Sequence, residues 1–217
     1  MRLVDELAIE HERIEKVAGA FRTYARRRAA RQAPREDGVR FIEFFRRYAG
    51  EFHHAREEEV LFAALREGTE LPVDRGPIAA IVEDHRRMAE LLDRLAPLAA
   101  GEDGHEAEIL ELTLRYTEEL WHHIDAETSV LFPESVVRLR RHGVAELEGR
   151  DPTAEEAAAG ADGEALLVSY PPTAEPGVLR GDGCIACPSY ERTCRGLERE
   201  WWNEWEWEEF EDHLPSG

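Results

Sequence analysis

The sequence lacks any run of about 18 apolar residues, the length that a membrane-spanning helix requires. The first six residues show neither a basic segment nor an apolar one, so no secretory signal is visible. We therefore expect a cytoplasmic protein that has no membrane partner.

Lysine is nearly absent, and Lys16 is the only one in the chain. Acidic residues outnumber the basic ones, and the net charge is −20. Residues 1–150 hold 23 basic and 31 acidic residues, a difference of −8, whereas residues 151–217 hold 4 and 16, a difference of −12. A negative field of this size repels phosphate backbones and anionic lipid surfaces. Nucleic acids and membranes are therefore not expected as partners.

Strand-like alternation of useful length is also missing before residue 150. Apolar residues instead recur every three or four positions, which is the pattern of amphipathic helices. The segments with this pattern are roughly 3–31, 39–66, 76–99 and 106–132. Pro133 is expected to stop or kink the last helix, and 134–141 to form a further short one. Four long helices with short connections predict an all-α fold, an antiparallel up-down four-helix bundle over residues 1–145.

One ten-residue pattern occurs twice in this predicted bundle. Residues 53–62 and 123–132 both read His, three residues, Glu, three residues, Leu-Phe. Another histidine opens each half of the bundle, namely His11 in the first half and His85 in the second. The sequence thus predicts a duplicated helix pair, packed about a pseudo-two-fold axis.

The repeated pattern places polar groups on buried helix faces. Positions i and i+4 stack on one face of an α-helix, so His53 projects with Glu57 and His123 with Glu127. A single interior histidine is usually an ordinary core residue, but two buried carboxylates without Lys or Arg partners are costly. A pair of metal ions supplies the missing charge and takes the lone pairs of neutral imidazoles. The predicted metal ligands are His11, His53, Glu57, His85, His123 and Glu127.

Each motif also has a second histidine beside its first, namely His54 after His53 and His122 before His123. Aligning the two repeats pairs His53 with His123, and His54 then falls about 100° further around an α-helix. We expect His54 and His122 to lie beside the site, either as partners of the ligands or on the flank. Tyr116, two turns before His123, is a candidate hydrogen-bond donor near the site, and the alternative is a packed core tyrosine.

These six residues, over about residues 3–135, resemble the pattern of the hemerythrin-like (HHE cation-binding) family. The resemblance implies a non-haem di-iron centre inside a four-helix bundle, with Glu57 and Glu127 bridging the ions and the four histidines as terminal ligands. Oxygen-carrying hemerythrins have one more histidine on the third helix and end in HxxxxD. This chain resembles the HHE branch instead, whose members are linked to oxygen, nitric oxide or iron sensing and to iron–sulfur repair.

Two iron ions are therefore the expected cofactor, with manganese or a mixed pair as alternatives, because imidazole-rich ligation does not fix the metal. Six side chains leave open positions for O2, NO or peroxide, and an electron donor of unknown identity is expected. We interpret the chain as a protein that binds or senses O2, NO or redox state. The alternatives are a di-iron enzyme, which repairs iron–sulfur centres or consumes peroxide or nitric oxide, and an iron-storage or structural bundle.

Residues 146–217 differ in composition from the bundle. Asp151–Gly163 is rich in Ala, Glu and Gly and is expected to be a linker. All three cysteines follow it, at Cys184, Cys187 and Cys194. A zinc site there would need a fourth ligand that is not obvious, so redox-active thiols and unpaired cysteines remain alternatives. We expect this Cys/Trp-rich extension to pack on the bundle or on the second subunit of a homodimer.

Overall fold

The protein is described here by a computed structural model, in which residues 1–69, 76–101 and 103–173 are placed. Its elements are α1 (Arg2–Ala29), α2 (Arg35–Glu43), the π-helical segments η1 (Phe44–His54) and η2 (Glu57–Leu61), α3 (Phe62–Gly68), α4 (Gly76–Ala100), α5 (Glu106–Ala126), the π-helical η3 (Glu127–Leu131), α6 (Phe132–Arg141) and α7 (Ala154–Ser169). Within the placed residues there is no strand, and no helix is both long and apolar enough to cross a membrane.

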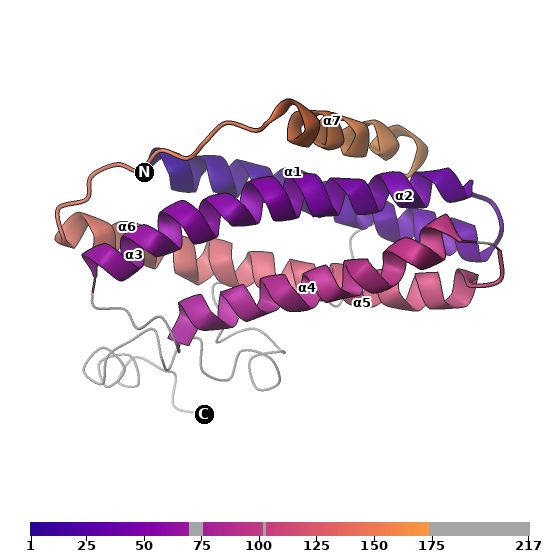
Figure 1. The fold of residues 1–217 in the computed structure, drawn as a ribbon, viewed down its shortest axis with the longest axis horizontal. Helices are drawn as coiled ribbons and strands as arrows, with labels where there is room; N and C mark the ends of the chain where they lie inside the picture. The colour runs from indigo at the N-terminus through magenta and orange to yellow at the C-terminus, as the bar shows by residue number, and fades with distance from the viewer. Residues whose placement is uncertain (70–75, 102, 174–217) are drawn as a thin grey trace.

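Four helical rods form the bundle (Figure 1). The elements α2, η1, η2 and α3 follow one another as one rod, α5, η3 and α6 form another, and α1 and α4 are the remaining two. The helix α1 packs on α5, and α4 packs on α2 and α5. The predicted all-α bundle is confirmed.

The rods extend further than the sequence pattern indicated. The second rod begins at Arg35 and not near residue 39, and the fourth continues to Arg141. Pro133 does not end the fourth rod, because it stands directly after the π-helical η3, in the first turn of α6, and the helix continues beyond it to Arg141.

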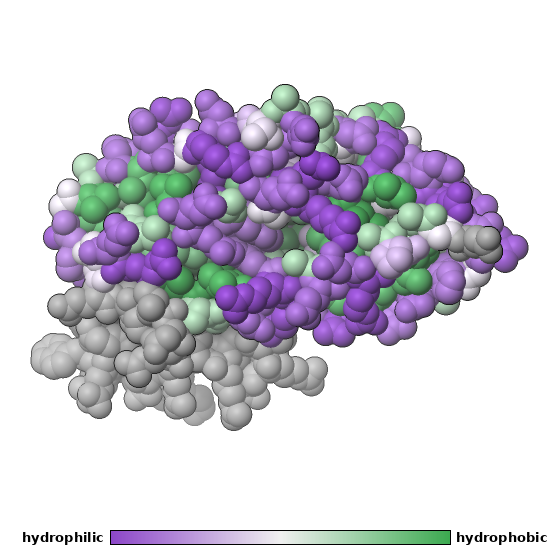
Figure 2. Space-filling model, in the orientation of Figure 1, coloured by the Kyte–Doolittle hydropathy of each residue, from purple (hydrophilic) through white to green (hydrophobic). Residues whose placement is uncertain are grey.

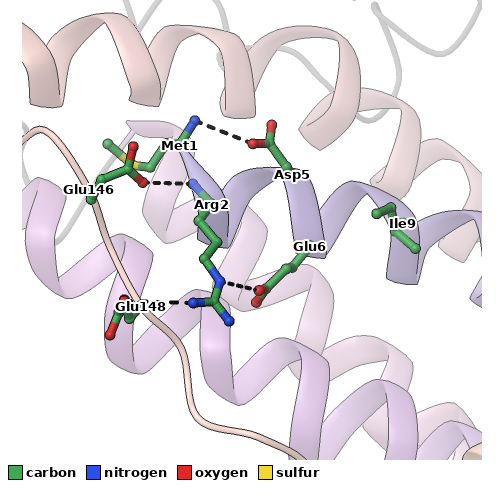
Figure 3. Close-up of a pocket in the computed structure, with 7 residues that line it drawn as sticks. All are labelled: Met1, Arg2, Asp5, Glu6, Ile9, Glu146 and Glu148. Atoms are coloured by element: carbon green, nitrogen blue, oxygen red, sulfur yellow. Dashed lines mark hydrogen bonds and ion pairs between the residues drawn. The ribbon is translucent and has the colours of Figure 1, made fainter.

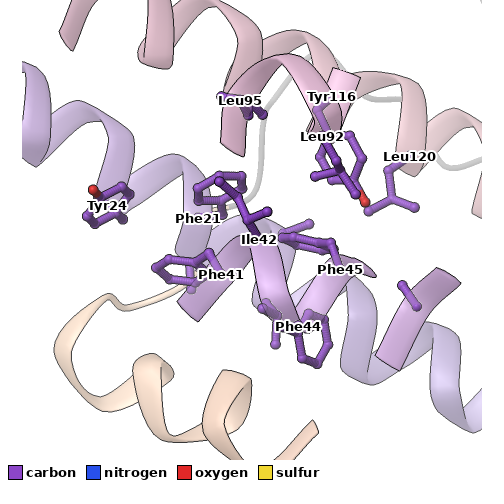
Figure 4. Packing of buried hydrophobic residues seen from close by; sticks show 14 of the residues in the cluster. Phe21, Tyr24, Phe41, Ile42, Phe44, Phe45, Leu92, Leu95, Tyr116 and Leu120 are labelled. Carbon is purple, nitrogen blue, oxygen red and sulfur yellow. The ribbon is translucent and has the colours of Figure 1, made fainter. Parts of the chain in front are cut away.

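The bundle interior contains two separate hydrophobic clusters. The larger one includes Phe21, Phe41 and Tyr116 (Figure 4), and the smaller one includes Leu7 and Leu61. Figure 2 shows the molecule in the orientation of Figure 1, and polar residues cover most of this outer face, as expected for amphipathic helices. Several buried polar residues, His11 among them, belong to neither cluster.

The prediction that Asp151–Gly163 is a linker is wrong, because α7 begins at Ala154. Thr153 and Glu156 form a capping box at its start: the Glu156 N–H donates to Thr153 Oγ1 at 3.3 Å, and the Thr153 N–H donates to Glu156 Oε2 at 2.7 Å. Such a pair satisfies two backbone N–H groups that a helix start would otherwise leave free. The signal Thr-x-x-Glu was present in the sequence.

The helix α7 lies across α1, α2 and η1 (Figure 1). Its small residues permit a close approach, since a Cβ at Gly163 would overlap the Phe44 ring and one at Gly160 would lie 2.8 Å from Tyr48. The small residues that suggested a linker therefore permit tight packing against aromatic rings.

Ion pairs and hydrogen bonds fasten this extension to the bundle as far as residue 173. Arg40 binds Asp162 at 2.6 Å, and the Tyr170 hydroxyl donates to Asp37 at 2.6 Å. The three cysteines of the Cys/Trp-rich segment, Cys184, Cys187 and Cys194, lie outside the described residues, and with them the sites that were predicted there.

We expect Gly163→Ala to lower the free energy of unfolding by about 1–3 kcal/mol, because the added methyl group overpacks the contact with Phe44. Chemical denaturation followed by circular dichroism measures the change. The matched control is Gly50→Ala, whose Cβ would meet its nearest neighbour at an ordinary 3.5 Å. This control should be neutral or stabilising by up to about 1 kcal/mol. Equal stability of the two variants would contradict the packing role of Gly163.

Candidate metal centre

The six side chains predicted as ligands converge between the two hydrophobic clusters. Along α1, Leu7 belongs to the smaller cluster and Ile14 to the larger, and His11 lies between them. The exposed fraction is 6% or less for every member, and it is 0% for both glutamates. The six residues are His11 from α1, His53 from η1, Glu57 from η2, His85 from α4, His123 from α5 and Glu127 from η3.

The carboxylate of Glu57 lies between histidines of both halves. Its Oε1 is 3.3 Å from His53 Nε2 and 3.7 Å from His11 Nε2. Its Oε2 is 3.5 Å from His85 Nε2. The two oxygens thus face opposite sides of the cluster.

Glu127 occupies the matching position in the second half. Its Oε2 is 3.2 Å from His11 Nε2 and 3.1 Å from His123 Nε2. Its Oε1 is 4.0 Å from His85 Nε2. Glu127 thus contacts histidines of both halves, as Glu57 does.

The buried acceptors of this cluster lack hydrogen bonds. Neither oxygen of Glu57 or Glu127 has a hydrogen-bond partner among the described residues, and the Nε2 atoms of His11 and His53 have none either. The short distances above therefore do not have hydrogen-bond geometry. Leaving a buried polar atom unsatisfied costs about 1–3 kcal/mol. This arrangement therefore fits metal cations bound between the carboxylate oxygens and the imidazole nitrogens.

The potential ligand atoms form two groups that share Glu57. One group is His11, His53, Glu57 and Glu127, and the other is His54, Glu57, His85 and His123. Within each group the ligand atoms lie within 4.8 Å of one another. Imidazole and carboxylate donors at this spacing are able to hold two metal ions with a carboxylate in common.

His54 does not lie on the flank, as the helical period indicated, but within the second group. Its ring stacks on His85 at a centroid distance of 3.8 Å and an angle of 9°. The reason is the π-helical η1, in which each N–H bonds to the fifth residue before it, so a turn holds more residues. The α-helical period therefore fails across η1, and two neighbouring histidines face the centre.

A signal for this wider helix was present in the sequence. Apolar residues or histidine come as adjacent pairs at 44–45, 48–49 and 52–53, a wider stripe than an α-helix shows, and the structure buries all three pairs. The second motif has Ile124 at the place of His54, so the fifth histidine belongs to one half only.

The other two residues expected near the site behave differently. His122 is half-buried and belongs to neither group of ligand atoms. Tyr116 is buried in the larger hydrophobic cluster, where its ring packs edge-on against Phe45 at 5.0 Å (Figure 4). Its surroundings favour the packed core tyrosine over a hydrogen-bond donor to the centre.

The second ring nitrogens of four histidines face acids or a hydroxyl, which the sequence analysis missed. Metal-binding histidines commonly use this nitrogen for an orienting hydrogen bond. The Nδ1 contacts are His53 to Glu10 at 2.8 Å, His85 to Glu58 at 2.7 Å, His11 to Thr128 at 2.9 Å and His123 to Asp84 at 3.7 Å. A signal was available, because an acid precedes the opening histidine of both halves, in Glu10-His11 and Asp84-His85.

The repeated Leu-Phe also has a structural role. Phe132 of the second motif stacks on His11 at a centroid distance of 5.1 Å and an angle of 7°. Phe62 of the first motif lies parallel to His85 at 6.5 Å and 12°. Each phenylalanine therefore covers the histidine that opens the other half.

Burial and neighbouring charges shift the pKa values of several residues in this centre. Burial is the largest single effect on His53 and favours its neutral form. The combined attraction of Glu57 and Glu10 nevertheless outweighs it and raises the pKa of His53 to about 10.

In the second half, burial likewise opposes the charge of His123, but Glu127 and Asp84 together raise the pKa of His123 to about 10. Burial favours the protonated form of Glu127, and the nearby histidines, His123 first, lower its pKa well below the usual value. Burial lowers the pKa of His11 and of His54, so these two rings stay neutral.

A surface pocket of about 530 Å³ lies between η2 and α4. Two of the residues that line it, Glu58 and Phe62, also contact His85. These two side chains therefore lie between the pocket and His85 of the centre.

Comparison with known proteins agrees with this geometry. No curated protein and no solved structure matches the chain at a significant level. A family model described as the hemerythrin HHE cation binding domain matches residues 2–135, which is more than half of the chain. The matched span contains both motifs and both opening histidines, and it confirms the resemblance drawn from them. The chain therefore belongs to the hemerythrin HHE cation-binding family.

Proposed function

We propose that this centre binds two non-haem iron ions, and that the protein uses them to bind or sense O2, NO or redox state. One observation carries the proposal: two groups of potential ligand atoms share Glu57, and the oxygens of both glutamates have no hydrogen-bond partner among the described residues. Glu57 and Glu127 would bridge the ions, and five histidines would complete the ligand set. Bound iron would supply a redox couple and open positions for a small ligand.

The ligand composition favours binding or sensing over oxidation of a substrate. Only two carboxylates accompany five imidazoles in the two groups. Fewer anionic ligands stabilise highly oxidised iron less well, so slow redox turnover is expected at most. The residues of the chain would keep a bound small ligand away from bulk water. Two aromatic rings cover the opening histidines, and the glutamates are themselves shielded from bulk water.

The first prediction concerns metal content. Protein purified without added chelator should hold about two iron ions per chain, as in other di-iron helical bundles. Its absorption spectrum should differ between oxygen-free and aerated buffer. The double variant Glu57→Ala, Glu127→Ala should lose both ions, and the matched control Glu59→Ala, at an exposed neighbour, should keep both. Zinc alone, with no spectral change in air, would refute the proposal, as would full iron content in the double variant.

A second prediction separates the two additional histidines of the motifs. His54→Ala should weaken metal binding about 10- to 100-fold, because His54 lies among the potential ligands. His122→Ala is the matched control and should leave the affinity unchanged. Chelator competition with Fe(II) under nitrogen measures both. Equal affinities of the two variants would place His54 outside the ligand set.

A third prediction follows from the raised pKa values, about 10, of His53 and His123. These values lie above the ordinary histidine pKa of about 6.5, so both rings carry a proton at neutral pH in metal-free protein. Metal binds only the neutral ring, and binding must release these protons. The affinity for Zn(II) should therefore rise with pH, by about tenfold per pH unit for each proton released. Chelator competition at several pH values measures the slope, and a flat profile would contradict the assignment.

A further inference from the structure

An unbroken series of charged contacts connects His53 to the protein surface. Glu10 binds His53 Nδ1 through Oε2 at 2.8 Å, and its Oε1 pairs with Arg56 Nη1. The other Arg56 nitrogen, Nη2, pairs with Glu6. Glu6 in turn accepts from Arg2 Nε at 2.8 Å, in the surface pocket shown in Figure 3.

The central member of this series is buried. Arg56 is 3% exposed, and its guanidinium lies 5.0 Å from the centre of the Phe52 ring. A guanidinium presents its N–H groups in a rigid planar fork, so it fixes the direction of the carboxylates that it binds. Arg56 therefore constrains Glu10, and Glu10 constrains the imidazole ring of His53.

The other half of the bundle has no such lock among the described residues. Asp84, which corresponds to Glu10, lies 3.7 Å from His123 Nδ1 and pairs with Arg87, whose side chain is 48% exposed. The second motif has Ala126 at the position of Arg56. The duplicated halves thus hold equivalent ligand histidines by different means.

His85, in the second ligand group, is also supported from the solvent side. Its Nδ1 partner Glu58 is 40% exposed and lines the pocket between η2 and α4. By contrast, the Glu10 side chain is only 10% exposed. Of the four histidines with such a partner, His53 is therefore the one held from the bundle interior, through Glu10 and the buried Arg56, whereas His11 contacts the exposed Thr128 and His85 the half-exposed Glu58.

We propose that Arg56 is a positioning residue that locks Glu10 on His53 and thereby makes the two ion positions unequal. The divalent cation in the His11–His53 group is bound more tightly, and the cation in the other group exchanges more readily. This inference rests on the proposed dinuclear centre.

Titration of the metal-free full chain with Co(II), in competition with a chelator and followed by visible absorption, tests the inference. The wild type should bind two Co(II) ions in two steps of unequal affinity. Arg56→Ala should weaken the tighter step about 10- to 100-fold and leave the other nearly unchanged. Arg56→Lys should recover part of the loss, since a lysine keeps the charge but not the fork.

Two further variants keep the result interpretable. Arg87→Ala removes the exposed arginine of the other half and should leave both steps as in the wild type. Glu10→Gln keeps the side-chain volume and should reproduce the selective loss, and it decides the matter if Arg56→Ala fails to fold by circular dichroism. Equal weakening of both steps, or unchanged affinities in Glu10→Gln, would overturn the inference. A wild type that binds fewer than two Co(II) ions would refute the proposed centre instead.

Discussion

The structure depends on the burial of two carboxylates in the middle of a helical bundle. Glu57 and Glu127 are fully buried and have imidazole nitrogens as their nearest charged neighbours. The buried Arg56 does not neutralise them, because it pairs with Glu10 and Glu6. Several histidines direct Nδ1 outward to acids or a hydroxyl, so their Nε2 atoms face the same small volume as the carboxylates. In metal-free protein the two carboxylates share this volume with the protonated rings of His53 and His123, and bound cations would take the place of those protons.

The residues that both copies of the motif share have different roles. Its histidine and glutamate provide potential ligand atoms, and its phenylalanine covers the opening histidine of the other half. Both glutamates also begin π-helical segments, Glu57–Leu61 and Glu127–Leu131. Such segments are rare and often occur at functional sites, where they redirect side chains. The motif is therefore a unit of both backbone geometry and chemistry, which accounts for its length.

Helical periodicity was sufficient to predict the four rods and the convergence of six side chains, because i and i+4 positions stack wherever the backbone is close to α-helical. It was insufficient at His54, since the π-helical η1 changes the angle between neighbours. Periodicity also missed α7, because this helix has no hydrophobic stripe. It packs instead through Gly160 and Gly163, whose backbone lies close to aromatic rings. A fixed helical period contains no information on the surface against which a helix packs, or on whether its backbone is α- or π-helical. Both failures have this cause.

The departures from internal symmetry bear most directly on function. Duplication alone would give two equivalent ion positions, but the first motif has His54 and Arg56 where the second has Ile124 and Ala126. The histidine adds a ligand atom to the group of His85, and the arginine strengthens the support of the opposite group through Glu10. A single three-residue stretch therefore modifies both ion environments in different ways. Because the two changes act on opposite groups, the two sets of potential ligands differ in composition and in support, and this difference is the basis for the unequal ion affinities that we propose.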